Sequence, residues 1–293
     1  MAEYKSEDFI KVAMWMVGAL TSTSMMAVSI REIGPGLSPF QILFIRSFIG
    51  LVVVATMIRL SGRTQQFFTN QPKLHFARSF FHFCGQYGWI TGLTLLPLAE
   101  VFAIEFTAPI WTIILAAAFL NERITPAKVG SIFLAIVGVF IIVKPGDEII
   151  NPASLLVLAT AVFFAASYVV TKLLAYTESP LTVLLYMSAV QCFLGFVFGI
   201  ASWVQPAFSQ WLWILALALA GLAAHYSITK ALQLADTSMV VTIDLLRLPL
   251  ISLVGIIAYG EYGTITLFVG GLLILVGNAL NIYTNLPERN KTI

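Results

Sequence analysis

The sequence predicts an all-α integral membrane protein of ten transmembrane helices, arranged as two inverted five-helix repeats. Three observations predict it: the composition, the length of the apolar segments and a repeat between the two halves of the chain. Of the 293 residues, 59% are hydrophobic and 10% are charged, and the mean hydropathy is +0.93. Soluble domains carry about 25% charged residues. So much apolar surface cannot be buried in one soluble core, and we expect the lipid bilayer to cover it.

The apolar segments are about 20 residues long, which is the length that a helix needs to cross ~30 Å of hydrocarbon. Short polar stretches separate them. No cleavage site follows the first segment, so we expect no signal peptide. The predicted spans are residues 9–30, 38–60, 73–96, 98–120, 126–143, 153–175, 180–203, 207–234, 236–259 and 262–284.

Positive charge predicts the orientation, because cytoplasmic loops are enriched in Lys and Arg. If the N-terminus is cytoplasmic, most Lys and Arg residues near the span ends lie on the cytoplasmic side, and only Arg31 and Lys144 lie outside. We therefore expect both termini in the cytoplasm. The formal net charge is +2 and no basic run is present, so nucleic acid is not an expected partner.

The two halves of the sequence correspond at a constant offset of 139 positions. The matching pairs include Tyr87 with Tyr226, Glu105 with Asp244, Glu122 with Glu261, and Gly138 with Gly277. Two acidic pairs in register, inside spans or at their ends, are hard to ascribe to chance. Each half holds five spans, an odd number, so the second half must enter the membrane in the opposite sense. We predict one repeat over residues 1–145 and another over residues 146–293, in a single membrane domain, with a binding site between them.

Three motifs of the first half follow one another along the chain. Residues 92–100 read GLTLLPLAE, residues 107–109 read TAP, and residues 119–125 read FLNERIT. They resemble the EamA-type family of the drug/metabolite transporter (DMT) superfamily, in which a helix that begins at such a Leu-Ala segment ends in a Glu-Arg or Glu-Lys turn. The second half repeats the pattern more loosely, at Leu234-Ala235-Asp236, Pro249 and Gly260-Glu261. The resemblance thus covers essentially the whole chain, and it is greatest to the uptake carriers for S-adenosylmethionine within the family.

The resemblance implies a secondary transporter of a small polar metabolite, in the plasma membrane of a bacterium (its inner membrane), without a cofactor. Proton coupling or exchange and a monomeric state are further expectations. An intramembrane enzyme and a non-transporting scaffold are the alternatives. An enzyme would need a nucleophile with a base or a metal set, and no such motif appears in the spans. A scaffold would have little reason to keep deep charges in both halves.

Ionisable residues deep in a span are costly, so each is a candidate functional residue. Asp244 and Arg247 stand three apart on one helix face, which allows them to pair, as a structural bridge or as part of a site. Glu105 has no basic residue within reach on its own helix, and Arg46 is the natural partner from another helix. A static Arg46–Glu105 bridge and a pair that exchanges protons or ligands both remain open. The more terminal Arg78 is interpreted as snorkelling to the membrane surface.

Aromatic residues in the same spans complete the candidate substrate site. They are Tyr87, Trp89, Trp111, Tyr168 and Tyr226. An aromatic wall beside a carboxylate suits a cationic or quaternary amine group. Arginines recognise carboxylates through paired hydrogen bonds. Together these features predict a zwitterionic or cationic substrate.

Glycines and prolines predict two further roles. Gly138 and Gly270, with other small residues of spans 5 and 10, allow close helix contact. The resemblance implies that these two spans support the bundle. Pro109 and Pro249 lie within spans 4 and 9, where each removes a backbone hydrogen bond, so we expect bent helices that act as moving gates. No cluster has the spacing of metal ligands.

Overall fold

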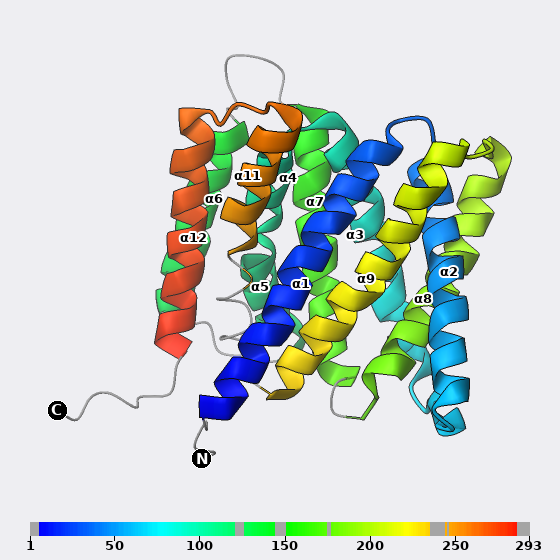
Figure 1. Ribbon diagram of the computed structural model, residues 1–293. Coiled ribbons are helices and arrows are strands. Elements are labelled where there is room, and N and C mark those ends of the chain that lie inside the picture. The colour runs from blue at the N-terminus through cyan, green and yellow to red at the C-terminus, as the bar shows by residue number, and fades with distance from the viewer. Residues whose placement is uncertain are drawn as a thin grey trace.

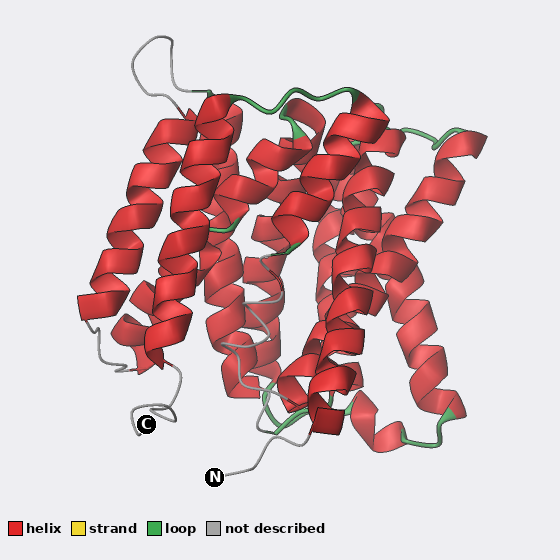
Figure 2. Cartoon of the chain, turned by 60° about the vertical axis from the view of Figure 1, so that its left-hand side comes forward, coloured by secondary structure: helices red, strands yellow, loops and turns green. Residues whose placement is uncertain are grey.

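The computed structural model describes residues 6–120, 126–143, 151–174, 177–234, 244 and 246–285, and the regular elements in this part of the chain are all helices (Figure 2). The first half contains α1 (Ser6–Ile33), α2 (Pro39–Leu60), the 3-10 helix η1 (Thr64–Phe67), α3 (Pro72–Leu95), α4 (Leu98–Glu105), α5 (Ala108–Leu120) and α6 (Pro126–Val143). The second half contains α7 (Pro152–Leu174), α8 (Pro180–Gly199), the 3-10 helix η2 (Ile200–Ser202), α9 (Phe208–Leu234), α11 (Arg247–Tyr259) and α12 (Ile265–Asn285).

Several helices begin where the sequence supplies a capping residue followed by proline. Ser38 precedes α2, and its hydroxyl accepts a hydrogen bond from the backbone N–H of Gln41 at 3.2 Å. Ser179 precedes α8 and accepts from the N–H of Thr182 at 3.1 Å. Proline at the first helical position costs no hydrogen bond, because the first N–H groups of a helix have no partner within it. The two Ser-Pro dipeptides therefore mark the starts of α2 and α8.

The surface and the interior have the polarity of a membrane protein. Six segments of the described residues are long and apolar enough to cross a membrane: Ile10–Ile33, Pro39–Leu60, Leu98–Phe119, Pro152–Thr171, Pro180–Ser202 and Phe208–Ala231. Large apolar side chains such as Phe119, Phe133 and Ile257 are exposed, whereas Arg46 and Glu105 are buried. Polar groups inside and apolar groups outside are what a bilayer requires. The chain is therefore an all-helical, multi-pass integral membrane protein.

The helices agree with the predicted spans to within a few residues, with one correction. The span predicted over 98–120 consists of two helices, α4 and α5, which are separated by Phe106 and Thr107. In the span predicted over 236–259, residues 236–243 and 245 lie outside the described residues, and α11 covers the end of that span.

The largest helix contacts join the two halves of the chain. α1 packs along α9, α2 along α8, α3 along α7, and α6 along α12, while the short α4 packs against α11 (Figure 1). In Figure 1 α1 begins at the lower side and α7 begins at the upper side. α12 ends on the side where α1 begins. The two halves thus form one body, and they start on opposite sides of it.

Glycines allow α6 and α12 to approach closely. A Cβ atom at Gly138 would lie 2.6 Å from the backbone oxygen of Gly270, and one at Gly270 would lie 2.5 Å from the backbone oxygen of Gly138. No larger side chain fits at these distances unless the helices separate. The predicted close contact is therefore confirmed at Gly138 and Gly270. Gly130, on the same helix α6, faces open space.

Candidate functional site

A buried break between α4 and α5 positions the main group of charges. Pro109 has no N–H group, so it cannot donate to the carbonyl oxygen of Glu105 four residues earlier, as a continuous helix would require. Thr107 closes α4 instead, because its backbone N–H and its hydroxyl donate to the carbonyl oxygen of Ile104 at 3.1 and 2.8 Å. The predicted bend within one helix is wrong here, because Pro109 lies in the first turn of a second helix. Pro249 likewise lies in the first turn of α11.

The carboxylate of Glu105 lies at the end of α4, and only 6% of the residue is exposed. Its Oε2 accepts a hydrogen bond from the indole Nε1 of Trp89 at 2.9 Å. Its Oε1 lies 3.3 Å from Nη2 of Arg247. Glu105 belongs to the first half of the chain and Arg247 to the second, so this ion pair connects the halves at the helix break.

Arg247, the first residue of α11, is shared between two carboxylates. Its Nη2 also donates to Oδ2 of Asp244 at 3.0 Å, so the pair predicted from their spacing forms. Its guanidinium carbon lies 5.2 Å from the ring centroid of Phe102 and 5.1 Å from that of Phe106, which are cation–π distances. Two carboxylates and one guanidinium leave an excess of negative charge when all three are ionised. We call Trp89, Glu105, Asp244 and Arg247 the acidic cluster.

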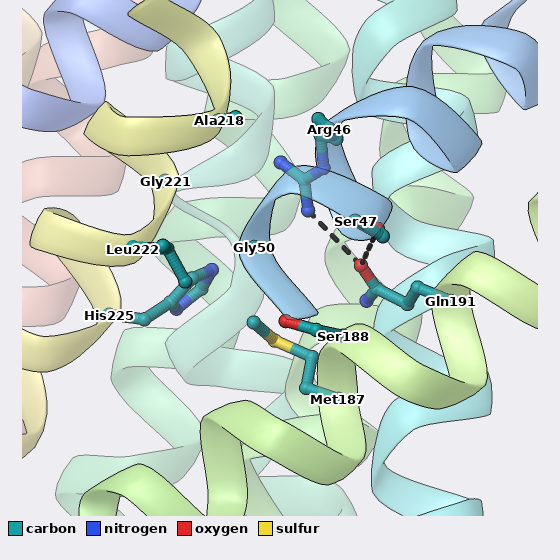
Figure 3. Close-up of a pocket in the computed structure, with 10 residues that line it drawn as sticks. All are labelled: Arg46, Ser47, Gly50, Met187, Ser188, Gln191, Ala218, Gly221, Leu222 and His225. Atoms are coloured by element: carbon teal, nitrogen blue, oxygen red, sulfur yellow. Dashed lines mark hydrogen bonds between the residues drawn. The ribbon is translucent and has the colours of Figure 1, made fainter. Parts of the chain in front are cut away.

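The predicted Arg46–Glu105 pair is wrong. Nη2 of Arg46 instead donates to Oε1 of Gln191 on α8, at 3.1 Å (Figure 3). The arrangement of the helices explains the difference, because α2 packs along α8 whereas α4 packs against α11. The partner of Glu105 therefore comes from the other half of the chain.

Gln191 connects Arg46 to the buried His82 and, through it, to His225. Its Oε1 accepts from Arg46 and from the hydroxyl of Ser47 at 3.5 Å, so its amide nitrogen must be the donor toward Nδ1 of His82, at 2.6 Å. Nδ1 of His82 then accepts and carries no proton. The ring of His82 meets the ring of His225 edge to face, with centroids 4.9 Å apart.

Two of the five candidate aromatic residues lie near the acidic cluster. Trp89 bonds Glu105 directly. Tyr168 on α7 interacts electrostatically with Glu105, Asp244 and Arg247, and 49% of it is exposed. Tyr87 instead stacks on Phe40 of α2, with centroids 4.6 Å apart. Tyr87 and Trp89 are two positions apart on a helix, so they point in nearly opposite directions.

The other two aromatic candidates have packing partners elsewhere. The indole of Trp111 donates to the hydroxyl of Thr107 at 3.1 Å, and its ring lines an apolar cavity of about 240 Å³ between α5, α6 and α7. Tyr226 meets Trp15 edge to face at 5.8 Å. Neither residue makes a contact with the acidic cluster in the described part of the structure.

Sequence reasoning missed Gln191 and misplaced Arg78. Arg78 is only 6% exposed, and its Nε donates to the hydroxyl of Thr171 at 3.3 Å, so the snorkelling interpretation is wrong. The spacing of the polar residues on α3 could have indicated that Arg78 belongs to a polar helix face. His75, Arg78, His82 and Gln86 recur every three or four positions, and such residues share one helix face.

A third group of charges joins helix ends on the side where α1 ends. Nη2 of Arg31 donates to Oε1 of Glu261 and to the carbonyl oxygen of Leu96, both at 2.8 Å. Oε2 of Glu261 accepts from the backbone N–H of Leu98, the first residue of α4, at 2.9 Å. A carboxylate at a helix N-terminus is favourable because it meets free N–H groups. One carboxylate thus holds α1, α4 and the turn between α11 and α12 together.

Comparison with known proteins gives consistent matches over most of the chain. The model of the EamA-like transporter family matches residues 10–144 and 151–283. An S-adenosylmethionine uptake transporter of Rickettsia bellii is 25% identical over 279 residues, which cover 95% of this chain and 96% of that protein. A riboflavin transporter of Brucella anthropi is 28% identical over 268 residues, which cover 89% and 94%. One solved crystal structure has the same fold, with a TM-score of 0.65 and 19% identity over 93% of this chain and 96% of that chain.

Proposed function

Because the chain belongs to the EamA-like transporter family, we propose that it is a secondary transporter that carries a small zwitterionic or cationic metabolite across the membrane by alternating access. Its relatives are named as transporters of small metabolites, and none of the names quoted above is that of an enzyme. One observation carries the proposal: the buried Glu105–Arg247 ion pair joins the two halves where a helix is interrupted. Secondary transporters with inverted repeats bind substrate at such discontinuous helices, between the repeats.

The pairing of helices supports two inverted repeats, over residues 1–145 and 146–293. A two-fold axis that exchanges α1 with α7 and α3 with α9 converts the α1–α9 contact into the α3–α7 contact. The same axis maps the α2–α8 and α6–α12 contacts onto themselves. The four largest helix contacts of the structure have this pattern, and α1 and α7 begin on opposite sides (Figure 1).

The excess negative charge of the acidic cluster favours a substrate that carries a cation. The ring faces of Phe102 and Phe106 also suit a positively charged group. S-adenosylmethionine, which the Rickettsia bellii relative takes up, carries a sulfonium and an ammonium group. Riboflavin carries neither. We therefore propose that the substrate resembles S-adenosylmethionine in charge, or is another amino acid or quaternary amine.

Alternating access would use the same charges. A substrate cation, or a proton, competes with Arg247 for Glu105 and so loosens a contact between the halves. The Arg31–Glu261 contacts close the side where α1 ends, and they must break for that side to open. Pro109 and Pro249, in the first turns of α5 and α11, are positioned as hinges. In this proposal both termini face the cytoplasm of a bacterium, the protein lies in the inner membrane, and it works as a monomer.

Reconstitution tests the proposed function. The purified chain in proteoliposomes should take up labelled S-adenosylmethionine, or another labelled cationic or zwitterionic metabolite, at a rate that saturates with concentration. Unlabelled cationic analogues should compete, and riboflavin should not. Protein-free liposomes are the control for leakage. If no cationic or zwitterionic compound shows saturable uptake, the proposed function is wrong; uptake of riboflavin alone would make the substrate assignment wrong.

A further inference from the structure

Two buried arginines have no carboxylate partner in the described part of the chain. Arg46 and Arg78 are each 6% exposed. Arg46 donates to the neutral amide of Gln191, and Arg78 donates to the hydroxyl of Thr171. Nη1 of Arg78 is buried without a hydrogen-bond partner. A buried guanidinium is costly unless it is paired, so both side chains require a counter-charge that these described contacts do not supply.

Two histidines lie near the arginines and bring no negative charge. His82 and His225 each interact electrostatically with both Arg46 and Arg78. The hydrogen bond from Gln191 makes Nδ1 of His82 an acceptor. Nε2 of His225 is buried without a hydrogen-bond partner. We call Arg46, Arg78, His82, Gln191 and His225 the basic cluster.

A small cavity adjoins the basic cluster and leaves room for a ligand group. It has a volume of about 20 Å³ and is lined by Arg46, Ser188 and His225 among others (Figure 3). About 10–15 Å³ is enough for a group the size of water. Gly221 lines the cavity, and a Cβ atom there would come into ordinary van der Waals contact with Nη1 of Arg46, at 3.6 Å. One small polar group, such as a carboxylate oxygen, fits beside the guanidinium.

We propose that the basic cluster is an anion subsite that receives the carboxylate of the transported molecule. The inference rests on the proposed function, and it narrows the substrate class to zwitterions whose carboxylate and cation lie some distance apart. The acidic cluster receives the cation. Tyr168 on α7 is near enough to both clusters to interact electrostatically with Arg78 and with Asp244. S-adenosylmethionine has this form, because its sulfonium is separated by several bonds from its carboxylate.

A pair of ligands that differ only in the carboxylate tests the proposal. Binding of S-adenosylmethionine and of decarboxylated S-adenosylmethionine is measured on the purified full chain by thermal shift. The wild type should prefer the carboxylated ligand by about tenfold or more, as expected for a charged hydrogen-bonded pair. Arg46→Gln and Arg78→Gln should each lose most of this preference and still bind the decarboxylated ligand. Arg59→Gln, at the exposed end of the same helix as Arg46, should keep the preference.

Other results would overturn the anion subsite, or would show that the proposed substrate is wrong while the anion subsite is still tested. Equal loss of both ligands in a folded Arg46→Gln protein, with Arg46→Lys restoring neither, would overturn the anion subsite. If the wild type binds neither ligand, the substrate assignment of the proposed function fails and acetate becomes the probe. Acetate should then raise the melting temperature of the wild type and of Arg59→Gln, but not that of Arg46→Gln. Stabilisation by chloride that equals or exceeds stabilisation by acetate would overturn the carboxylate assignment.

Discussion

Arg247 is the residue on which the acidic cluster depends, because it is the cation that two buried or half-buried carboxylates share. Both Glu105 and Asp244 contact its Nη2, at 3.3 and 3.0 Å. In the interior of a membrane protein, no water is available to replace the guanidinium of Arg247 as a partner of these carboxylates, so its loss is costly. The contacts of Arg247 therefore stabilise the two halves against each other. At the same place a substrate cation can compete with Arg247 for the carboxylates.

Removal of Arg247 should destabilise the protein more than removal of the whole pair. Arg247→Ala leaves buried carboxylates without a cation, which costs about 3–5 kcal/mol in comparable buried pairs. The double variant Arg247→Ala with Glu105→Gln should recover part of that loss, because the amide needs no counter-charge and only Asp244 is left without its cation. Thermal unfolding in detergent measures both. A double variant no more stable than Arg247→Ala would show that the two side chains act independently.

Sequence reasoning at this scale identified the charged residues but not all of their partners. The Asp244–Arg247 pair could be predicted, because it depends only on spacing along one helix. The partner of Glu105 could not, because spacing along the chain does not say which helix of the second half packs against α4. The buried environment of Arg78 was missed for a related reason: its position near the end of a span allowed snorkelling, and the packing of α3 against α7 and α8 was unknown.

At the scale of helices, the break between α4 and α5 matters most for the site. A continuous helix over 98–120 would leave the carbonyl oxygen of Glu105 without its helical donor, because Pro109 has no N–H group. The interruption at Phe106 and Thr107 ends α4 at the carboxylate itself. Pro109 was a visible signal for a distortion, but a proline is compatible both with a kink and with the first turn of a new helix.

The contact between α6 and α12 yields a prediction with a matched control. Gly138→Ala places a Cβ 2.6 Å from the backbone oxygen of Gly270, and overpacking of this kind costs about 1–3 kcal/mol. Gly130→Ala, on the same helix and facing open space, should be neutral or slightly stabilising. Thermal unfolding should therefore rank Gly138→Ala below the wild type and Gly130→Ala level with it. Equal melting temperatures for both variants would contradict close packing at Gly138.

At the scale of the whole molecule, three groups of charges among the described residues occupy different positions. The Arg31–Glu261 contacts lie on the side where α1 ends, and the acidic cluster lies at the break between α4 and α5. The basic cluster lies between α2, α3, α8 and α9. All three connect residues of the first half to residues of the second. The alternating access that we propose would have to rearrange each of them.

The all-helical membrane fold and the positions of most described helices could be predicted from apolar segment length. The pairing of the helices could not, because it depends on three-dimensional packing between halves. Because the helix pairing was unknown, Arg46 was expected beside Glu105. The error changes the proposed roles of both residues, since each now belongs to a separate cluster of opposite charge.

The initial rate of substrate uptake by Glu105→Gln in proteoliposomes tests the central claim most directly. The amide keeps the shape of the side chain and loses its charge, so a substrate cation or a proton can no longer compete with Arg247 for a carboxylate. We predict a protein that folds and melts near the wild type but has lost most of its uptake. Glu100→Gln, on the same helix and bonded to Ser154 outside the acidic cluster, should retain uptake. Wild-type rates in Glu105→Gln, with the same preference among substrates, would contradict a binding site at the junction of the two halves.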